Sequence, residues 1–332
     1  MEFPETIRLT LEAQVQRYGT PACAQAARQL SLRYRSEGGG GKRLAVTGAE
    51  VAAYAVTRMP ATFGAVYSAL RWSLACVRCR PASLLDAGAG TGAASLAAAA
   101  LLPLQKAVLL EREEEMIRLG RSLLESASLP CAEWRRGDIR DGLPLRAGLV
   151  VSSYMLNELS ETELPQALKN LWDAAGEMLL LVEPGTPAGF SILRRAREQL
   201  TGQGAFVAAP CPHARSCPLP EGDWCHFTCR VARSRLHKQF KGGEAPFEDE
   251  KFSYLALVRE PAQPVSARIL RHPYKETGKI TLQLCTNEGI CPAAIRKRDG
   301  AAFKSARKAG CGDAFDFPAL WENRPESAGQ ET

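Results

Sequence analysis

The chain of 332 residues is long enough for one large domain with additions, or for two domains. Hydrophobic residues make up 45% and charged residues 23%, a globular mixture that excludes disorder along the whole chain. The net charge of +6 is modest, so a nucleic-acid surface requires local clustering of basic residues. The 11 cysteines are too sparse for a disulfide-stapled scaffold and indicate reduced thiols, some of them available to a metal.

Neither the start of the chain nor its longest apolar run indicates a membrane or export signal. Residues 1–12 include acids and no apolar stretch, unlike a signal or transit peptide. The apolar run 93–104 is alanine-rich and about half as long as a bilayer span requires. We therefore expect a cytoplasmic protein without membrane contact.

Residues 1–80 have the pattern of a helical N-terminal region. A capping box, Thr-Gly-Ala-Glu at 47–50, precedes apolar residues at helical spacing. We expect the glycine run 38–41 to separate two helices. We also expect Pro60 to break the following helix, which then continues to about Cys79.

From residue 83 onward, short apolar runs alternate with helical stretches, which is typical of a parallel sheet covered by helices. A second capping box at 160–163 starts the helix between the third and fourth strands. The predicted strands are 83–87, 107–111, 148–154, 177–183 and 252–259.

The chain therefore divides into four parts. Residues 81–260 form the α/β domain, interrupted by a basic, cysteine-rich insertion at 201–250. Residues 261–317 form a small β-rich basic extension, and we expect the polar tail 318–332 to be disordered. The strands predicted in the extension are 267–270, 279–285 and 291–295.

The first chemical motif joins a strand to a helix through glycines. Asp86 precedes Gly88, Gly90 and Gly92, and a helix follows at 93–100. Glycines let the backbone approach a ligand closely, and a helix N-terminus offers unpaired N–H groups. The alternating glycines differ from the G-x-G-x-x-G spacing of dinucleotide-binding loops. A tight turn that packs helix on strand without any ligand remains the alternative.

Two acids extend this motif, because Glu111 ends the next strand and Asp138 lies in the loop beyond it. The combined pattern resembles the class I (Rossmann-like) S-adenosylmethionine-dependent methyltransferases. The resemblance implies a cofactor site in which Asp86, Gly88, Gly90, Thr91 and Gly92 hold the methionine part of S-adenosylmethionine, Glu111 the ribose and Asp138 the adenine amino group.

A methyl acceptor would lie near the loop after the strand predicted at 148–154. This loop has neither an Asn/Asp-Pro-Pro-aromatic motif nor a cysteine nucleophile. Methyl transfer can proceed mainly by alignment, so Tyr154, Asn157 and Glu158 could orient a base. Equally, Tyr154 could pack in the core while Asn157 and Glu158 cap a helix. We expect a methyltransferase, with a cofactor-binding chain that has lost catalysis as the alternative.

The second motif places four thiols, Cys211, Cys217, Cys225 and Cys229, within 19 residues. The segment has too few aliphatic residues for a hydrophobic core of its own, so we expect a bound metal or another cross-link to stabilise it. Its first gaps of 6 and 8 residues do not fit the paired C-x2-C knuckles of zinc ribbons. Irregular spacing with proline after cysteine suits an iron–sulfur cluster at least as well.

The block 210–254 resembles the Rsm-twenty-two family of methyltransferase-like proteins, together with the glycine loop, the element 59–62 and the Lys-Arg-Asp-Gly run at 297–300. The resemblance covers roughly residues 45–312. It implies association with the rRNA of the small ribosomal subunit, in assembly and translation, and we expect a monomer away from the ribosome. It also implies a [4Fe–4S] cluster, with zinc as the alternative, on Cys211, Cys217, Cys225 and Cys285.

Positive charge is concentrated at 230–308, which has 17 basic and 8 acidic residues and a net charge of +9. Residues 230–241 contain five basic residues and no acid, and we expect a helix whose basic face meets RNA phosphates. A solvated face paired with the acids at 248–250 is the alternative. The predicted RNA-binding residues are Arg230, Arg233, Arg235, Lys238, Lys241, Lys297 and Arg298.

Overall fold

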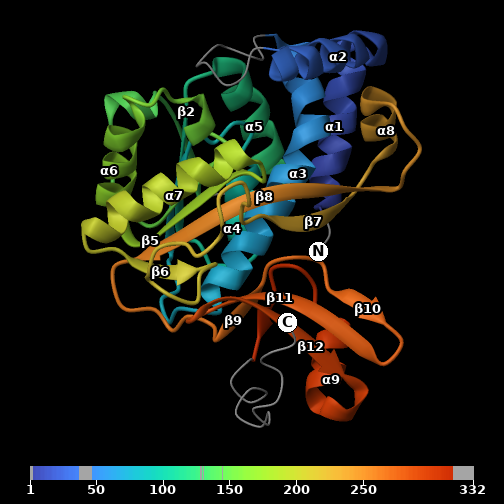
Figure 1. Ribbon diagram of the computed structural model, residues 1–332. Coiled ribbons are helices and arrows are strands. Elements are labelled where there is room, and N and C mark those ends of the chain that lie inside the picture. The colour runs from blue at the N-terminus through green and yellow to red at the C-terminus, as the bar shows by residue number, and fades with distance from the viewer. Residues whose placement is uncertain (1–2, 37–46, 128, 130, 144, 317–332) are drawn as a thin grey trace.

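A larger unit built around a central sheet lies above a smaller unit of short strands in the computed structural model (Figure 1). None of the helices described is long and apolar enough to cross a membrane. The glycine run 38–41 and the tail 318–332 lie outside the described residues, so the predictions for them stay untested. The structure describes residues 3–36, 47–127, 129, 131–143 and 145–316.

Three helices precede the sheet: α1 (Glu5–Tyr18), α2 (Thr20–Ser36) and α3 (Gly48–Leu74). The predicted capping box starts α3. The Thr47 hydroxyl accepts the Glu50 N–H at 3.3 Å, and the Glu50 carboxylate accepts the Thr47 N–H at 3.0 Å. Two otherwise unpaired N–H groups are thereby satisfied at the helix start.

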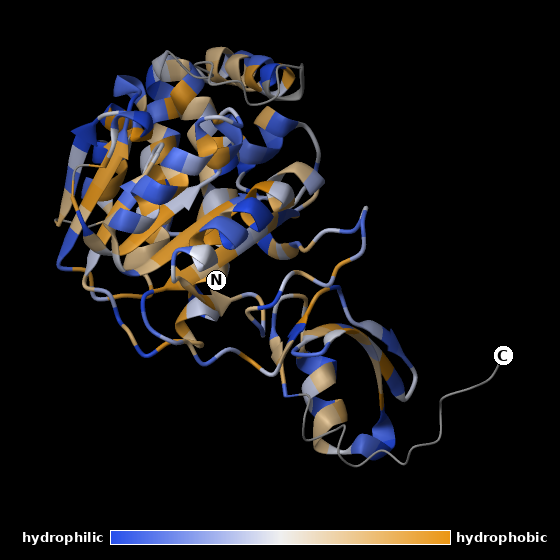
Figure 2. Ribbon diagram, turned by 60° about the vertical axis from the view of Figure 1, so that its left-hand side comes forward, coloured by the Kyte–Doolittle hydropathy of each residue, from blue (hydrophilic) through white to orange (hydrophobic). Residues whose placement is uncertain are grey.

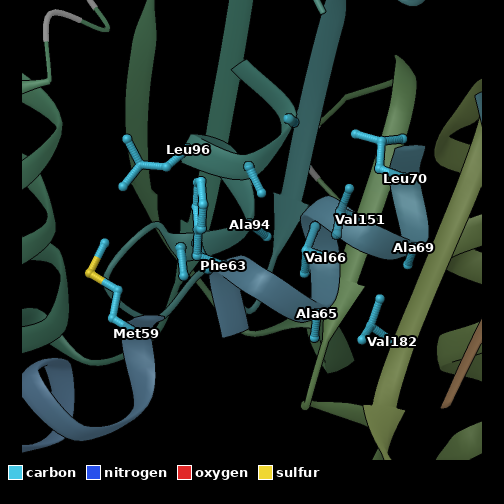
Figure 3. Packing of buried hydrophobic residues seen from close by; sticks show 14 of the residues in the cluster. Met59, Phe63, Ala65, Val66, Ala69, Leu70, Ala94, Leu96, Val151 and Val182 are labelled. Carbon is cyan, nitrogen blue, oxygen red and sulfur yellow. The ribbon is translucent and has the colours of Figure 1, made fainter. Parts of the chain in front are cut away.

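The predicted break at Pro60 is wrong, because α3 continues through it. Proline removes one backbone donor and usually kinks a helix. Here the Thr57 hydroxyl donates to the Ala53 carbonyl at 2.8 Å one turn earlier. Met59 and Phe63 are buried on the same helix, close to α4 (Figure 3). Packing of α3 against the sheet and its helices therefore outweighs the lost hydrogen bond.

The central sheet has the strand order β3-β2-β1-β4-β5-β8-β6. Its first five strands are parallel, and β8 is antiparallel to both of its neighbours, β5 and β6. The five predicted strands are present, β1 with the predicted ends and the other four with shifted ends, whereas β3 and β6 were not predicted. The strands are β1 (Ser83–Ala87), β2 (Lys106–Glu111), β3 (Ala132–Arg136), β4 (Ala147–Ser153), β5 (Ala175–Pro184), β6 (Phe206–Ala209) and β8 (Phe247–Val258).

Helices cover both faces of this sheet. The helices α3, α4 (Ala93–Ala99) and α5 (Glu114–Ser126) share one hydrophobic core with it, and α6 (Leu164–Ala174) and α7 (Pro187–Gly202) share the other. Side chains alternate between the two faces along a strand, so Leu84 belongs to the first core and Leu85 to the second. Figure 2 shows the apolar strands enclosed by more polar helices.

The cysteine-rich insertion ends in a hairpin of β7 (Phe227–Ala232) and the first half of β8, with α8 (Arg235–Lys241) between them. The single helix predicted over 230–241 is therefore wrong in its first part. Phe227, Cys229 and Val231 are buried at alternate positions, the period of a strand. The Phe227 ring lies 5.6 Å from that of Trp72 in α3, centroid to centroid, which fixes the hairpin onto the larger unit.

The smaller unit has its own core, formed where β11 and its neighbouring strands pack against one helix. All three strands predicted in this part are present. Main-chain contacts tie the unit to the rest, because the Gln263 N–H donates to the Cys76 carbonyl at 2.8 Å. Its elements are β9 (Ala267–Ile269), β10 (Tyr274–Glu276), β11 (Lys279–Thr286), β12 (Gly289–Arg296), α9 (Ala301–Lys308) and β13 (Ala314–Phe315).

Candidate functional site

A cavity of about 130 Å³ lies at the carboxyl ends of β1, β2 and β4. Open α/β sheets bind ligands at this edge, where the strand order reverses direction. The loops after β1, β2, β3 and β4 form its walls, and Tyr54, Met59 and Thr62 of α3 line the remaining side. The predicted cofactor residues that line it are Gly88, Gly90, Thr91, Glu111 and Asp138, whereas Asp86 and Gly92 do not.

The loop after β1 needs its glycines. Gly88, Gly90 and Gly92 have φ angles of +78°, +56° and +89°, in the left-handed region that other residues rarely adopt. A Cβ atom on Gly88 would lie 2.8 Å from the Met155 side chain. A Cβ atom on Gly90 would meet nothing within 4 Å, because the backbone there borders the cavity.

Glu111 anchors the glycine loop as well as lining the cavity. One carboxylate oxygen accepts the Gly90 N–H at 2.8 Å, and the other accepts the N–H groups of Arg112 and Glu113 at 2.8 and 3.0 Å. Burial raises the pKa of this carboxyl, and these three hydrogen bonds oppose the rise. The side chain is therefore held at the end of β2, facing the ligand space.

Asp86 has a structural position beneath the cavity. It is fully buried, and one oxygen accepts both the N–H and the hydroxyl of Ser95 in α4, at 3.1 and 2.7 Å. Burial raises the pKa of Asp86 to about 7. The residue thus orients the helix that follows the glycine loop, and direct contact with a ligand is not part of this geometry.

Asp138 and Arg112 meet on the opposite wall. Hydrogen bonds from Arg140 lower the pKa of Asp138 to about 2. The Arg112 guanidinium lies 3.7 Å from Asp138 and 3.5 Å from Glu158. Arg112 was not predicted, although its place directly after Glu111 at a strand end was a usable signal. The cavity therefore has an acidic wall whose carboxylates pair with two lining cations, Arg112 and Arg140.

The three candidate catalytic side chains all have partners. The Tyr154 hydroxyl donates to Glu250 at 2.9 Å, and Arg58 donates to the same carboxylate at 3.0 Å. Burial raises the pKa of Tyr154 well above its usual range. Tyr154 also has a φ of +57°, which is uncommon for an aromatic residue. The hydroxyl is thus fixed toward β8.

Asn157 and Glu158 lie in a short 3-10 turn, Leu156–Glu158, after β4. The Asn157 amide donates to Glu183 at 2.9 Å, and Glu183 also accepts the Leu156 N–H at 2.9 Å. Burial raises the pKa of Glu183 to about 7. Glu158 and Tyr154 both line the cavity, with Glu158 hydrogen-bonded to Arg112, whereas Asn157 does not line it.

A second cavity, of about 50 Å³, contains the predicted metal ligands. Cys211 and Cys217 come from the insertion, Cys225 precedes β7, and Cys285 lies in β11 of the smaller unit. Burial raises the pKa of Cys211, Cys225 and Cys285, to about 12 for Cys285, and the neighbouring thiols raise it further. Cys229 instead faces the core shared with α3.

The four thiols share this cavity without forming a site for a single metal ion. Among the residues that the structure describes, no three His, Cys, Asp or Glu side chains are arranged to hold one ion. The nearest pair is Cys285 and His213, whose sulfur and Nε2 atoms lie 3.7 Å apart. Four thiolates are the donor set that a cubane cluster would require, one for each iron.

The predicted RNA-binding residues divide into paired and unpaired cations. Arg230 donates to Asp249 at 2.9 Å and Lys241 to Glu248 at 2.9 Å, so part of the solvated-face alternative is observed. Lys297 and Arg298 are exposed on the smaller unit, and Arg235 is exposed on α8.

The strand order, with one antiparallel strand between β5 and β6, and the glycine loop after β1 define the class I, Rossmann-like methyltransferase fold, as predicted. Solved structures with this fold include magnesium protoporphyrin IX methyltransferase of Synechocystis with bound SAM, at 15% identity and a TM-score of 0.41 over 60% of this chain and 80% of that one. A precorrin-6y C5,15-methyltransferase of Geobacter metallireducens is similar at 18% identity and a TM-score of 0.38, over 56% and 83%.

The chain belongs to the family described as "Mitochondrial small ribosomal subunit Rsm22", whose profile matches residues 48–316. This confirms the predicted family. The human protein "Ribosome assembly protein METTL17, mitochondrial" is 28% identical over 256 residues, 70% of this chain and 55% of that protein. "Rsm22-cox11 tandem protein 2, mitochondrial" of Schizosaccharomyces pombe is 26% identical over 327 residues, 81% and 43%.

The chain thus spans about half the length of these curated relatives. Their names also bear on the predicted location. Each of the matched relatives is named as mitochondrial, which contradicts the cytoplasmic location predicted from the absence of a leader-like N-terminus. A mature or homologous chain need not carry the leader on which such a prediction depends.

Proposed function

We propose that the chain binds S-adenosylmethionine in the cavity at the glycine loop and acts in assembly of the small ribosomal subunit. The observation that carries the cofactor proposal is the cavity itself, at the carboxyl ends of parallel strands with Gly90 and Glu111 in its walls. Membership of a family named for the small ribosomal subunit supports the proposed role in its assembly.

Each wall of the cavity has chemistry that suits one part of this cofactor. The Glu111 carboxylate can accept hydroxyls of the ribose, and Asp138 can accept the amino group of adenine. The loop at Gly88 and Gly90 can take the methionine part, with Asp86 acting indirectly through Ser95. Bound there, S-adenosylmethionine supplies an activated methyl group on a sulfonium, whose positive charge suits the acidic lining.

Binding is tested by comparing Gly90→Ala with Gly242→Ala. Both glycines have a positive φ, at +56° and +65°, and space for a methyl group. Only Gly90 lines the cavity. We expect calorimetry to show at least a tenfold loss of S-adenosylmethionine affinity in Gly90→Ala alone. Equal affinities in the two variants would contradict this site.

Methyl transfer is the second question, and one observation favours a binding protein without catalysis. Tyr154, Asn157 and Glu158 are hydrogen-bonded or ion-paired to Glu250, Glu183 and Arg112. Small subunits from cells that lack the protein can be incubated with it and labelled S-adenosylmethionine. Binding without transfer supports an assembly factor on a methyltransferase fold, whereas label in the rRNA supports an rRNA methyltransferase.

We further propose that rRNA contacts the exposed cations of α8 and of the smaller unit. Arg235, Lys297 and Arg298 are exposed. Of the other predicted residues, Arg233 and Lys238 lie within three residues of Arg235 along the chain, and Arg230 and Lys241 already pair with acids. Replacing Lys297 and Arg298 by alanine should lower the slope of log affinity against log salt by about two. Lys169→Ala on α6 is the control, and an equal slope change there would argue against this surface.

We propose that the second cavity holds a [4Fe–4S] cluster on Cys211, Cys217, Cys225 and Cys285, with zinc as the alternative. Four thiols from two units of the fold, three of them half-buried and Cys285 buried, line one cavity and support it. Protein purified without oxygen should be brown, contain iron and sulfide in equal amounts, and lose both in Cys285→Ser. A colourless protein with stoichiometric zinc would overturn the cluster and retain the site.

A further inference from the structure

Three buried polar atoms around the cysteine cavity lack a hydrogen-bond partner among the described residues. They are Nε of Arg197, Nδ1 of His213 and the hydroxyl of Tyr254, and all three residues line the cavity. Buried polar groups are nearly always paired, so each exception requires an explanation. Three such atoms around one cavity indicate an occupant rich in hydrogen-bond acceptors.

Two positive charges are buried at the same cavity. Arg197 and Arg268 are only 7% and 2% exposed, and neither forms an ion pair with a carboxylate in the described part of the chain. Their partners are neutral. Arg197 donates to the carbonyls of His213, at 3.1 Å, and Arg215, and Arg268 donates to those of Pro210 and Gly312 at 3.1 and 3.0 Å. Carbonyl oxygens orient a guanidinium without neutralising its charge, and an uncompensated buried charge is costly.

We propose that Arg197, Arg268 and Tyr254 form the outer shell of an anionic, thiolate-bound group in the cysteine cavity. The two arginines balance its charge, and the unpaired Arg197 Nε and Tyr254 hydroxyl donate to its sulfur atoms. This inference rests on the metal site proposed above. Four thiolates around a [4Fe–4S] core leave a net charge of about −2, which two guanidinium groups match.

This shell links occupancy of the cavity to stability. Without the anionic group, the two charges and the hydroxyl are buried and unsatisfied, so the empty protein is strained. With the group present, the same atoms stabilise it and raise its reduction potential, because positive charge and hydrogen bonds to sulfur favour the more negative, reduced form. Changing the shell should therefore have opposite effects on the empty and the loaded protein.

Tyr254→Phe tests this with the least disturbance, because the ring stays in place against Trp72 and only the hydroxyl is lost. We expect the metal-free variant to melt at a higher temperature than metal-free wild type. The loaded variant should release its metal to a chelator on the order of threefold to tenfold faster, and its reduction potential should be more negative.

Arg197→Gln and Arg197→Lys form a second, matched pair. Gln removes the charge and keeps a polar donor, whereas Lys keeps the charge. We expect metal release to accelerate about tenfold or more with Gln and to remain closer to wild type with Lys.

A purely structural role for Arg197 predicts equal destabilisation of the empty and loaded forms and an unchanged potential, which would overturn the proposal. Metal release at the wild-type rate in both Tyr254→Phe and Arg197→Gln would overturn it as well, while leaving the metal site intact. A wild-type protein that holds no metal would instead remove the site itself. Release can be followed for zinc as for iron, so the comparison of release rates does not depend on which metal is bound, whereas the reduction potential is measured only for a cluster.

Discussion

Two buried carboxylates, Asp86 and Glu183, shape the cofactor cavity without lining it. Asp86 holds α4 through Ser95, and Glu183 holds the turn after β4 through Asn157. Burial raises the pKa of both to about 7. Ionising either carboxyl group in its buried position therefore costs free energy, although each side chain fixes one segment beside the cavity.

The stability of the protein should depend on pH through these two groups. Their pKa values are higher in the folded chain than in the unfolded chain, so the folded state binds more protons between about pH 4 and pH 7. Stabilisation is therefore complete below about pH 4 and is lost as the pH rises to about 7. Denaturant titrations across this range should show the free energy of unfolding falling by about 2 kcal/mol or more.

Asp86→Asn should make the free energy of unfolding fall less steeply with pH, because the amide keeps an acceptor for Ser95 and has no charge to bury. The exposed Glu161, replaced by Gln, is the control and should leave the slope as it is in the wild type. If Asp86→Asn has the full wild-type slope, the raised pKa of Asp86 is not the cause.

The same variant separates support from contact at the cofactor. We expect Asp86→Asn to change the affinity for S-adenosylmethionine by no more than about twofold, since Asp86 does not line the cavity. Glu111→Gln should weaken binding by about tenfold, because one hydrogen-bonded charge is lost from the wall. Calorimetry at constant pH measures both, and the reverse ranking would contradict the assignment of these two acids.

At the scale of helices and strands, local patterns predicted most of the fold. The apolar strands of the sheet were recognised, but β3 is a polar edge strand, Ala-Glu-Trp-Arg-Arg, whose composition gives no strand signal. In β7 the exposed Arg230 was predicted as part of a helix, because the spacing of the basic residues suggested one helical face. The alternate burial of Phe227 and Val231 indicates a strand instead.

The candidate sites, like the fold, could be predicted only in part. The glycine loop and the thiols of Cys211, Cys217 and Cys225 stand out in short segments of the sequence, whereas Cys285 was named only through the family resemblance. The partners of Tyr154 were not predicted, because Glu250 is 96 residues away and reaches it only through the place of β8 in the sheet. Contacts of this kind depend on strand order, which a single sequence does not reveal.

Packing of α5 against β3 gives a prediction in which two effects compete. A Cβ atom on Gly120 would lie 2.3 Å from the Trp134 ring, so alanine forces the ring to move. Alanine also gains up to about 1 kcal/mol in helix propensity. We expect the clash to outweigh the gain in helix propensity, so that Gly120→Ala lowers the free energy of unfolding by about 1–3 kcal/mol, measured by thermal or chemical unfolding.

Gly202, the last residue of α7, is the matched control, since a Cβ atom there meets nothing within 4 Å. Gly202→Ala should be neutral or stabilise the protein by a few tenths of a kcal/mol. If Gly120→Ala also stabilises it, the Trp134 ring has room to move and the helix–strand contact is looser than described.

For the whole molecule, the junction of the two units is the feature with the widest consequences. The smaller unit meets the larger through the Gly312 turn, which packs on Trp72, and through Arg268, which donates to Pro210. Cys285 brings the smaller unit into the cysteine cavity. The unit has its own core, so it can loosen from the junction without unfolding.

Gly312→Ala should loosen this junction. A Cβ atom there would lie 2.2 Å from the Trp72 ring, at a φ of +90° that alanine rarely adopts. We expect faster hydrogen exchange and proteolysis at residues 260–266, with slow exchange retained in β1 and β4. Gly278→Ala is the control, because its φ of +76° is similar and its surroundings are open. Equal changes in both variants would point to backbone strain alone.

The place of β8 also orders events in a chain that is being synthesised. Strands β1 to β5 pair in an arrangement that needs nothing beyond residue 184, and the cofactor cavity uses only residues 54–159. By contrast, β6 pairs only with β8, so residues 206–209 must wait until residue 258 has emerged. Cys285 emerges later still. A nascent chain can therefore form the first cavity well before the cysteine cavity, which lacks one of its walls until residue 285 has emerged.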